Sequence, residues 1–415
     1  MPPSLAGRSP SSLPTCYAAT PRRAARGGLT EKQENLLRGI DKIIGVVIVR
    51  CMRGSETKQS TMLSLLSPDQ RVPRNHPLRR VKEMADAALE ELSPVFDAMY
   101  SVVGRPSIPP ERLLKASLLM AFYTVRSERL FCEQLDYNLM FRWFLDMNMV
   151  EESFDHSTFS RNRERLIEHE VAARFFFAIV EQARSAGLMS DEHFTVDGTL
   201  IDAWASLKSF RAKGSKDDVA PPEDPGNPTI DFHGEKRSNE THESTTDPES
   251  RLARKGKGKE ARLSYSQHAL MENRNGLLLD LRIAEANGTA ERDVALQMLD
   301  EETSREKRCT LAGDKGYDTT DFVAECRERQ VTPHVAQNVG RRGGSAIDRR
   351  TTRHAGYAIS QRFRKRVEEI FGWTKTVGNF RKTRYKGREK TQLASYFIAT
   401  AYNLIRMVNL LHSTA

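Results

Sequence analysis

The sequence lacks any segment that could cross a membrane or direct secretion. The longest purely apolar stretch near its start runs from Ile43 to Val49, far short of the roughly 20 residues that a bilayer requires. Pro and Arg residues precede this stretch and do not form a secretory signal. These absences exclude a membrane span and predict that the protein has no membrane partner.

Cysteine is scarce and scattered. The chain has five Cys, and none belongs to a C-x-x-C pair. This spacing argues against a disulfide scaffold and a zinc ribbon, and it fits a reducing cytoplasm. Three catalytic signatures are missing as well: the H-E-x-x-H zinc motif, a Gly-rich phosphate loop ending in Lys-Ser/Thr, and the G-x-S-x-G nucleophile motif.

Length and positive charge are what the chain has in excess. Its 415 residues exceed one ordinary core, which predicts two domains plus irregular segments. Only 39% of the residues are hydrophobic and 29% are charged, so polar, unpacked stretches dilute the folded parts. The 64 Lys and Arg against 55 Asp and Glu give a net charge of +9, which favours a polyanionic partner.

Composition divides the chain into segments. Residues 1–61 are rich in Pro, Ser and Arg without a sustained period, which predicts a disordered or non-native extension. Residues 62–187 place Leu, Met and Phe at three- and four-residue steps, which predicts an all-helical domain. Residues 188–410 alternate strand and helix patterns, and within them the charged segment 208–262 is predicted to be a disordered insertion.

The pattern of residues 188–410 predicts an α/β domain with a mixed five-stranded sheet. A first strand in HFTVDGTLIDAWAS is followed by a hairpin whose turn spans Asn273 to Gly276. A helix from Ala290 to about Glu302, a strand in CTLAGDKGY, a helix in TTDFVAECRERQ, a strand in TPHVAQN and a long helix from about Ser360 complete the order.

Three acidic residues stand where chemistry is expected. Asp197 lies in the first strand, Asp314 follows a later strand, and Glu368 lies in the last helix. Open α/β sheets carry their sites just outside the carboxyl ends of such strands. Taken singly, however, an Asp near Gly is more often a turn residue, and a helical Glu more often faces solvent.

Taken together, the three carboxylates indicate a metal site. Hard oxygen ligands from separate elements are what a pair of Mg²⁺ ions requires. Two such ions about 4 Å apart can activate a water or hydroxyl and stabilise the leaving oxygen of a phosphodiester. We therefore predict that Asp197, Asp314 and Glu368 are catalytic and bind two Mg²⁺ ions, for which Mn²⁺ would substitute.

A strongly basic stretch surrounds Glu368. Residues 341–390 contain 16 Lys and Arg and four Asp and Glu, a net charge of +12. Such a run is most often a solvated face, but aromatic residues interleave with this one, as in a groove that follows DNA phosphates. Its cations predicted to contact DNA include Arg381, Lys382 and Arg384.

A second candidate DNA contact lies in the helical domain. Ser157 is expected to cap a helix that carries Arg161, Arg163 and Arg165 on its exposed side. Arg161 and Arg165 are predicted to contact DNA, and an ordinary surface helix is the alternative.

At these residues the sequence resembles the DDE transposases of bacterial insertion sequences, specifically the insertion-sequence-five superfamily. The resemblance covers about residues 62–407, with TVDGTLIDA carrying the first acid, GDKGYD the second and RKRVEEIFGWTKTVGNFRKTRYKG the third. The family's last motif is Tyr, two residues, Arg, three residues, Glu, six residues, Lys. Arg364, Glu368 and Lys375 fall in register with it, and Gln361 occupies the Tyr place.

The resemblance implies a ribonuclease H-like fold behind the all-α N-terminal domain. It implies Mg²⁺-dependent cleavage at the ends of the element and transfer of the freed 3′-OH to target DNA, with Arg364 and Lys375 binding phosphates near the cut. The implied partners are the terminal inverted repeats, target DNA and further copies of the chain, as a homodimer or larger synaptic complex. The implied place is the bacterial cytoplasm, at the nucleoid when DNA is bound.

Two alternatives remain open at this point. A stand-alone two-metal nuclease on the same fold would cut DNA without joining it to a target. An inactivated copy retained as a repressor would bind DNA without cutting it, although all three acids are present in this sequence.

Overall fold

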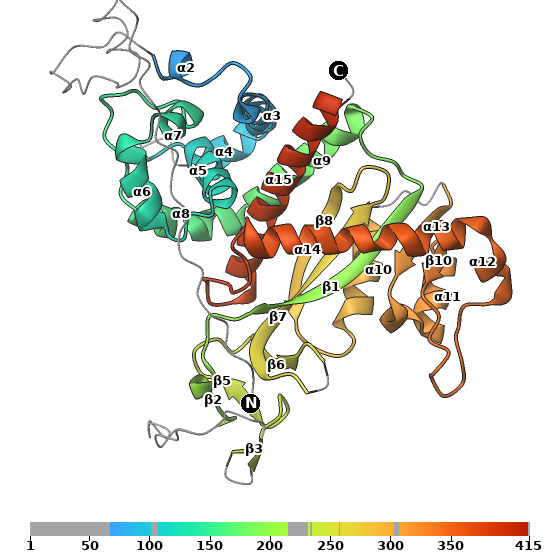
Figure 1. The fold of residues 1–415 in the computed structure, drawn as a ribbon. Coiled ribbons are helices and arrows are strands. Elements are labelled where there is room, and N and C mark those ends of the chain that lie inside the picture. Colours follow the sequence, from blue (N-terminus) through green and yellow to red (C-terminus); the bar gives the residue numbers. More distant parts are fainter. Residues whose placement is uncertain are drawn as a thin grey trace, which may run out of the picture. The chain divides into compact units, whose positions relative to one another are not determined.

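The computed structural model describes residues 67–100, 107–214, 231–232, 235–256, 258–302 and 307–413 (Figure 1). The predicted extension, residues 1–61, lies outside these ranges. Within them, no helix is both long and apolar enough to cross a membrane.

The first described part of the chain is helical, as the spacing of its apolar residues predicts. Pro77 and Pro110 open two of the helices at a position where the missing proline N–H costs no hydrogen bond. The side chains of Ser127 and Asn138 cap two others by accepting backbone N–H bonds. The helices are α2 (Pro68–Arg71), α3 (Pro77–Glu91), α4 (Ser93–Met99), α5 (Pro110–Phe122), α6 (Glu128–Tyr137), α7 (Leu139–Phe144), α8 (Ser157–Glu168) and α9 (Val171–Ser185).

The start of α8 differs from the prediction by one position. Ser157 is the first residue of the helix, and its side chain does not cap it. The carboxylate of Asp155 accepts the hydrogen bond of the Ser157 backbone N at 2.8 Å instead. Asp155 therefore satisfies the helix end that was assigned to Ser157.

Six strands form the central sheet, one more than predicted. The order is β10-β9-β1-β7-β6, and β8 also pairs with β7. The sheet is mixed, because β1, β9 and β10 run parallel whereas β7 is antiparallel to β1, β6 and β8. The strands are β1 (His193–Asp202), β6 (Arg251–Arg254), β7 (Ala261–Glu272), β8 (Leu278–Glu285), β9 (Cys309–Gly313) and β10 (Val331–Val335).

The additional strand, β6, lies inside segment 208–262, so the expectation of a disordered insertion is wrong for the described part of that segment. The side chain of Asp247 is 1% exposed and accepts hydrogen bonds from the Tyr265 hydroxyl at 2.7 Å and the Gly387 amide at 3.2 Å. Buried polar bonds order this part, so its low hydrophobicity hid its structure. Its other elements are η1 (Leu207–Ser209), β2 (Phe210–Ala212) paired with β5 (His242–Ser244), and β3 (Asp231–Phe232) paired with β4 (Glu235–Lys236).

Helices cover both faces of the sheet, and Figure 1 shows α14 in front of β1 with α10 behind the strands. On the α10 face, Val196 of β1 belongs to one apolar cluster with Met298. On the opposite face, Met271 of β7 packs in another cluster with Ile370 of α14. The helices are α10 (Ala290–Glu302), η2 (Lys315–Tyr317), α11 (Thr320–Glu328), α12 (Arg349–Arg353), α13 (Ala355–Phe363), η3 (Arg364–Arg366), α14 (Val367–Thr376) and α15 (Arg388–Ser413).

The predicted long helix from about Ser360 is interrupted. Helical turns run through α13, η3 and α14, and the chain then leaves the helix between residues 377 and 387. Asn379 and Gly387 have φ values of 52° and 88° there, in the left-handed region that ends a regular helix. This break lets α15 leave in a new direction.

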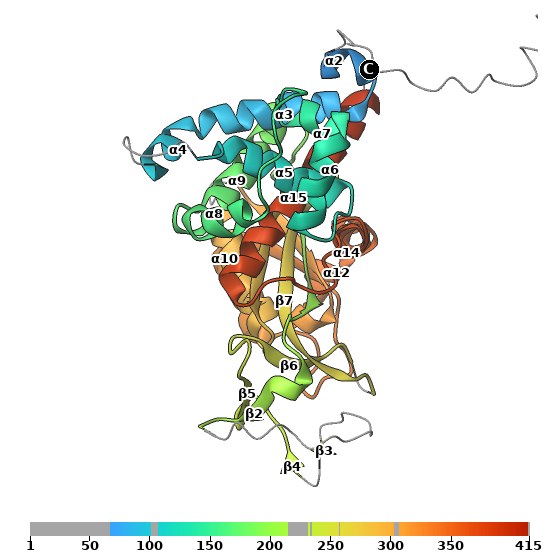
Figure 2. The same cartoon turned by 90° about the vertical axis from the view of Figure 1, so that its left-hand side faces the viewer.

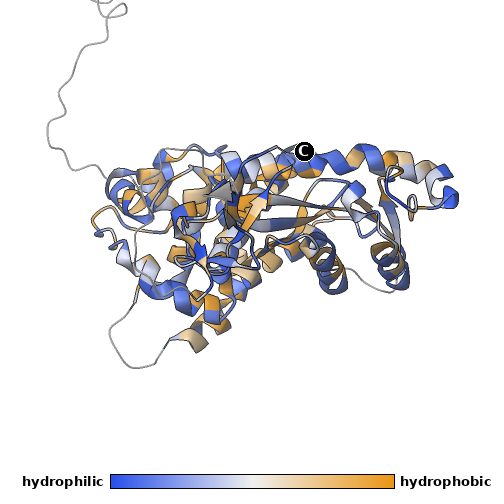
Figure 3. Cartoon of the chain, turned by 90° about the horizontal axis from the view of Figure 1, so that it is seen from below, coloured by the Kyte–Doolittle hydropathy of each residue, from blue (hydrophilic) through white to orange (hydrophobic). Residues whose placement is uncertain are grey.

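Helix α15 joins the helices to the sheet. It packs against α3, α5, α8 and α9 and also against β8 (Figure 2). One apolar cluster accordingly contains Leu113 of α5, Tyr265 of β7 and Leu404 of α15. The helices carry hydrophilic and hydrophobic residues in alternating bands (Figure 3). Secondary structure changes near the predicted boundary at 187/188, but the core is shared across it, and separate roles for 62–187 and 188–410 stay a prediction.

Candidate active site

The register of two parallel strands brings Asp197 and Asp314 together. Thr195 of β1 lies opposite Ala312 of β9. Two residues farther along each chain are Asp197, still in β1, and Asp314, just beyond the end of β9. Because side chains alternate with a period of two in extended chains, this step keeps both carboxylates on the same side of the sheet edge.

The turn interpretation is wrong for Asp197 and partly right for Asp314. Asp197 and Gly198 lie within β1, where they pair with Ala269 and His268 of β7. The side chain of Asp314 caps the short helix η2, since its Oδ1 accepts a bond from the Gly316 amide at 2.7 Å. One carboxylate is therefore held by a strand and the other by a turn at the strand's end.

Close approach explains the glycine after Asp197. A Cβ atom on Gly198 would lie 3.1 Å from Oε1 of Glu291 and 3.2 Å from Nδ1 of His268. Gly198 does not have a positive φ, so its backbone conformation does not require glycine. The missing side chain leaves room for Glu291, at the start of α10, beside the strand that carries Asp197.

These carboxylates repel one another without a balancing cation. Burial raises the pKa of Asp197 to about 6; the neighbouring Asp314 and Glu291 also raise it, against lowering effects of the Gly198 amide and Arg364. Among the described residues, none of these three acids forms an ion pair. The edge of the sheet thus carries excess negative charge that an added cation would neutralise.

The residues flanking Glu368 in its motif reach strand β1. The Lys375 ammonium donates a 2.6 Å hydrogen bond to Thr199 Oγ1, two residues beyond Asp197. Arg364 lowers the pKa of Asp197 by its positive charge. The exposed Glu368 lies between these two cations in the chain, at the start of α14.

No described interaction joins Glu368 itself to Asp197 or Asp314. Its neighbour Glu369 influences a different region, because its charge contributes to raising the pKa of Tyr402 on α15, which burial raises most. The structure therefore separates the two glutamates and leaves Glu368 as the one not directed toward α15.

The donor chemistry of the edge fits a divalent cation, although its geometry is incomplete. In the described part of the chain, no three His, Cys, Asp or Glu side chains are arranged to hold one metal ion. Two adjacent carboxylates, Asp197 and Asp314, supply hard oxygen ligands with uncompensated charge. A third ligand has to come from another acid that moves toward them.

The predicted DNA-binding cations after α14 divide into two groups. Arg381 and Lys382 lie beside the end of β1, where Asp202 N donates to the Arg381 carbonyl at 2.9 Å and Asp202 bridges Lys382 as in a parallel ladder. The Lys382 ammonium lies 5.7 Å from the ring centre of Trp204. Arg384 instead faces the helices, since its guanidinium donates to the Arg126 carbonyl at 2.6 Å.

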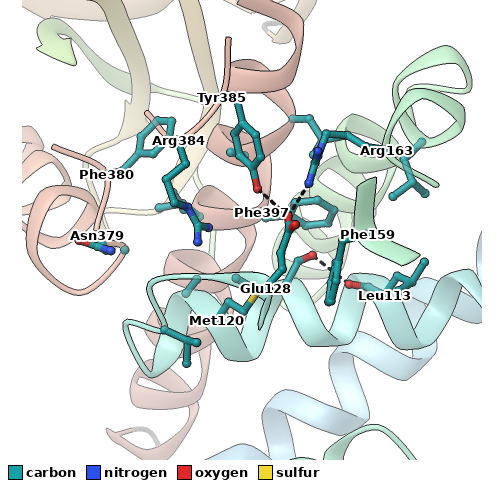
Figure 4. Close-up of a pocket in the computed structure, with 18 residues that line it drawn as sticks. Leu113, Met120, Glu128, Phe159, Arg163, Asn379, Phe380, Arg384, Tyr385 and Phe397 are labelled. Carbon is teal, nitrogen blue, oxygen red and sulfur yellow. Dashed lines mark hydrogen bonds and ion pairs between the residues drawn. The ribbon is translucent and has the colours of Figure 1, made fainter. Parts of the chain in front are cut away.

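Arg384 lines a cavity of about 60 Å³ between the helices and the segment after α14 (Figure 4). Glu128 lies at its centre and accepts hydrogen bonds from Arg163 and from the Tyr385 hydroxyl, the latter at 3.2 Å. The Arg163 guanidinium also lies 4.6 Å from the centre of the Tyr385 ring. Arg163 therefore has a structural role, and it is not on an exposed helix face.

The other two arginines of α8 differ in the same way. Arg161 is exposed, whereas the Arg165 guanidinium lies 4.6 Å from the centre of the Tyr100 ring and bonds to Asn162. Arg161 is free to meet a ligand, and Arg165 would have to leave this stacking to do so.

Glu291, Thr199 and Tyr317 were not found by sequence reasoning. Thr199 follows Asp197 by two residues, so the strand period was a usable signal. Glu291 lies in NGTAERD and Tyr317 in GDKGYD, where no local pattern indicates that the fold brings them to one place.

Comparison with known families identifies the chain. The model described as Transposase domain (DUF772) matches residues 66–165, and the model described as Transposase DDE domain matches residues 229–404. The chain is a DDE transposase. It is thus a polynucleotidyl transferase with a ribonuclease H-like catalytic fold, and its family uses divalent metal ions. Asp314 and Glu368 lie within the second matched stretch, whereas Asp197 lies outside both and is supported by its register.

Solved structures give only distant similarity, and no curated protein matches the transposase. A piggyBac transposase synaptic complex with hairpin DNA is 10% identical, with 82% of this chain and 77% of that chain covered at a TM-score of 0.38. A Mos1 strand transfer complex is 10% identical, with 94% and 98% covered at a TM-score of 0.18. A Mos1 mariner paired end complex with Mn is 11% identical, with 94% and 98% covered at 0.19. No argument rests on these scores.

Proposed function

We propose that this transposase cuts DNA at the ends of an insertion sequence and joins the freed 3′-OH to target DNA, using Asp197, Asp314 and Glu368 to hold two Mg²⁺ ions. Mn²⁺ would substitute. The observation that carries this proposal is the β1–β9 register, which puts two uncompensated carboxylates at one sheet edge. Within its family, the motif around Glu368 favours the insertion-sequence-five superfamily.

The acids have different positions and therefore different roles. Divalent ions, when bound, activate the attacking water or hydroxyl and stabilise the leaving oxygen. Asp197, in the middle of the edge, would bind both ions, and Asp314 and Glu368 would each bind one. The Lys375–Thr199 hydrogen bond ties α14 to β1 and limits how far Glu368 must move.

Arg364 is held for phosphate binding beside the cut. Its Nε donates to Gln361 Oε1 at 3.1 Å, and the Gln361 amide donates in turn to the His334 carbonyl at 2.6 Å. Gln361 stands where the wider family has Tyr, and it orients the arginine next to Asp197. A guanidinium in this position can bind a phosphate through two hydrogen bonds.

The transposase would bind terminal inverted repeats and target DNA as a homodimer or larger synaptic complex. Lys375, Arg381 and Lys382 line the end of β1, and Arg161 offers an exposed cation on α8. Arg165 and Arg384 would contribute to binding only after leaving their present contacts. The protein would act in the bacterial cytoplasm, at the nucleoid.

The test is a strand cleavage and joining assay on DNA carrying the element's end. Asp197→Asn and Asp314→Asn each remove a metal ligand's charge, and we expect both to lose at least about a thousandfold in cleavage and joining while end binding is kept. Near-normal cleavage by either variant would contradict the assignment.

The same assay separates the alternatives. A stand-alone nuclease would release cut ends with Mg²⁺ and never join them to target DNA. An inactive repressor would bind ends and neither cut nor join. Joined products with the wild-type chain, absent in the Asp197→Asn chain, exclude both.

A further inference from the structure

A fourth acid reaches the edge where Asp197 and Asp314 lie. Glu291 is exposed in the first turn of α10, and its Oε1 approaches Gly198, the residue after Asp197, to 3.1 Å from a built Cβ position. Burial raises the pKa of Glu291, and so does the charge of Asp314. Gly198 has no side chain to separate Glu291 from the strand.

Two buried polar atoms near Glu291 have no hydrogen-bond partner among the described residues. The Tyr317 side chain is 1% exposed; burial raises its pKa, and the charge with the largest further effect is that of Glu291, followed by Asp197 and Asp314. His268 is fully buried, and its Nδ1 points to the same position beside Gly198 while its Nε2 bonds to Ser266. Unpartnered buried groups of this kind are rare and call for a missing ligand.

An acid in the first turn of a helix has an ordinary explanation, which is stabilisation of the helix dipole. Asp293 shares that turn and that explanation. The explanation does not cover the approach of Glu291 to Gly198, the three acids without an ion pair, or the buried Tyr317 hydroxyl. The two acids of this turn therefore form a matched pair for comparison.

We propose that Glu291 is a fourth carboxylate of the active site and binds one of the divalent metal ions together with Asp314. This rests on the metal site of the proposed function. Asp197 would then lie between an acid on α10 and one on α14, so that each ion gains a ligand from a different helix. The Tyr317 hydroxyl would donate a hydrogen bond to a carboxylate of this group and hold its orientation.

Mn²⁺ binding to the full-length chain without DNA tests the proposal independently of activity. The free Mn²⁺ signal in electron paramagnetic resonance gives the dissociation constant for the wild type, Glu291→Gln, Asp293→Asn and Asp314→Asn. We expect Glu291→Gln to weaken binding about tenfold, as loss of a metal-site carboxylate does. Asp293→Asn, with the same charge change in the same turn, should stay within about twofold.

The outcomes distinguish the two proposals. Wild-type affinity in Glu291→Gln with weakened binding in Asp314→Asn overturns the role of Glu291 and leaves the proposed function standing. Wild-type affinity in both overturns the metal site itself. If Glu291→Gln unfolds, Gly198→Ala replaces it, because its Cβ displaces the Glu291 carboxylate; unchanged Mn²⁺ affinity in that variant also overturns the proposal.

Discussion

Two clusters of charge in this transposase are built in opposite ways. In the helical part, Lys115 is 4% exposed and pairs with Asp86 at 2.9 Å and with Asp146, while Lys82 pairs with the same two acids at 2.5 and 2.8 Å. At the sheet edge, Asp197, Asp314 and Glu291 meet without an ion pair in the described structure.

The pKa values follow this difference. Burial opposes ionisation of Asp146, but hydrogen bonds from Lys115 and Lys82 outweigh it and lower its pKa. Burial and like charges raise the pKa of Asp197 to about 6. A cluster that only stabilises the fold is neutralised within the fold, whereas the uncompensated cluster is suited to a cation from outside.

The largest expected effect concerns the acid from α14. We predict that Glu368→Gln lowers Mg²⁺-dependent cleavage by about a thousandfold, because it removes a ligand charge from the uncompensated cluster. Glu369→Gln, one residue away but near Tyr402, should keep most activity. Paired cleavage rates measure this, and the reverse pattern would show that Glu369 is the ligand.

The stability of the two clusters should change in opposite directions. Lys115→Met leaves two acids to one lysine, and we expect the free energy of unfolding to fall by about 2 kcal/mol, less than for a fully buried pair because Asp86 and Asp146 are partly exposed. Asp197→Asn relieves repulsion and should raise it by about 1 kcal/mol in EDTA.

Urea unfolding of both variants beside the wild type measures this difference. Lys115→Arg is the control for the first change, since it keeps the charge. A loss of stability in Asp197→Asn would show that the carboxylates at the sheet edge are already compensated.

DNA affinity should show a smaller effect on α8. Removing the exposed Arg161 as Arg161→Ala is predicted to weaken binding to element ends about fivefold and to lower the salt slope by about one, as loss of a phosphate contact does. Arg165→Ala should weaken binding too, with an added loss of stability from the Tyr100 contact. Arg80→Ala on α3 is the matched control, and equal affinity in all three at every salt concentration would identify α8 as an ordinary surface helix.

The smallest effect is a difference in pH dependence. The lowered folded-state pKa of Asp146 means that its stabilisation is complete above its unfolded value of 3.8 and is lost as pH falls through the folded value. The raised pKa of Asp197 has the opposite sign, so in EDTA its cost to stability disappears as pH falls from about 6 toward 3.8.

We therefore predict that Asp146→Asn flattens the stability profile below about pH 4, and that Asp197→Asn flattens it between about pH 4 and 6. Thermal unfolding at a series of pH values measures both. Identical profiles for the two variants would remove the distinction between the clusters.

Much of the architecture was predictable because it depends on short-range pattern. The helix at residues 290–302 was predicted with the ends it has, and the hairpin turn at residues 273–276 follows from Asn and Gly in sequence. The predicted disorder of 208–262 failed in its described part, because Asp247 is held by partners far away in the chain, such as Gly387. Sequence composition does not report such partners.

For the site, the sequence by itself determined the family and the residue types: acids at 197, 314 and 368 in recognisable motifs, and a basic stretch around the last. Only the tertiary structure decided which charges meet. The parallel register set Asp197 beside Asp314, and the packing of α10 behind β1 brought Glu291 to Gly198. Strand register and helix packing join residues about a hundred positions apart, and no local pattern encodes those distances.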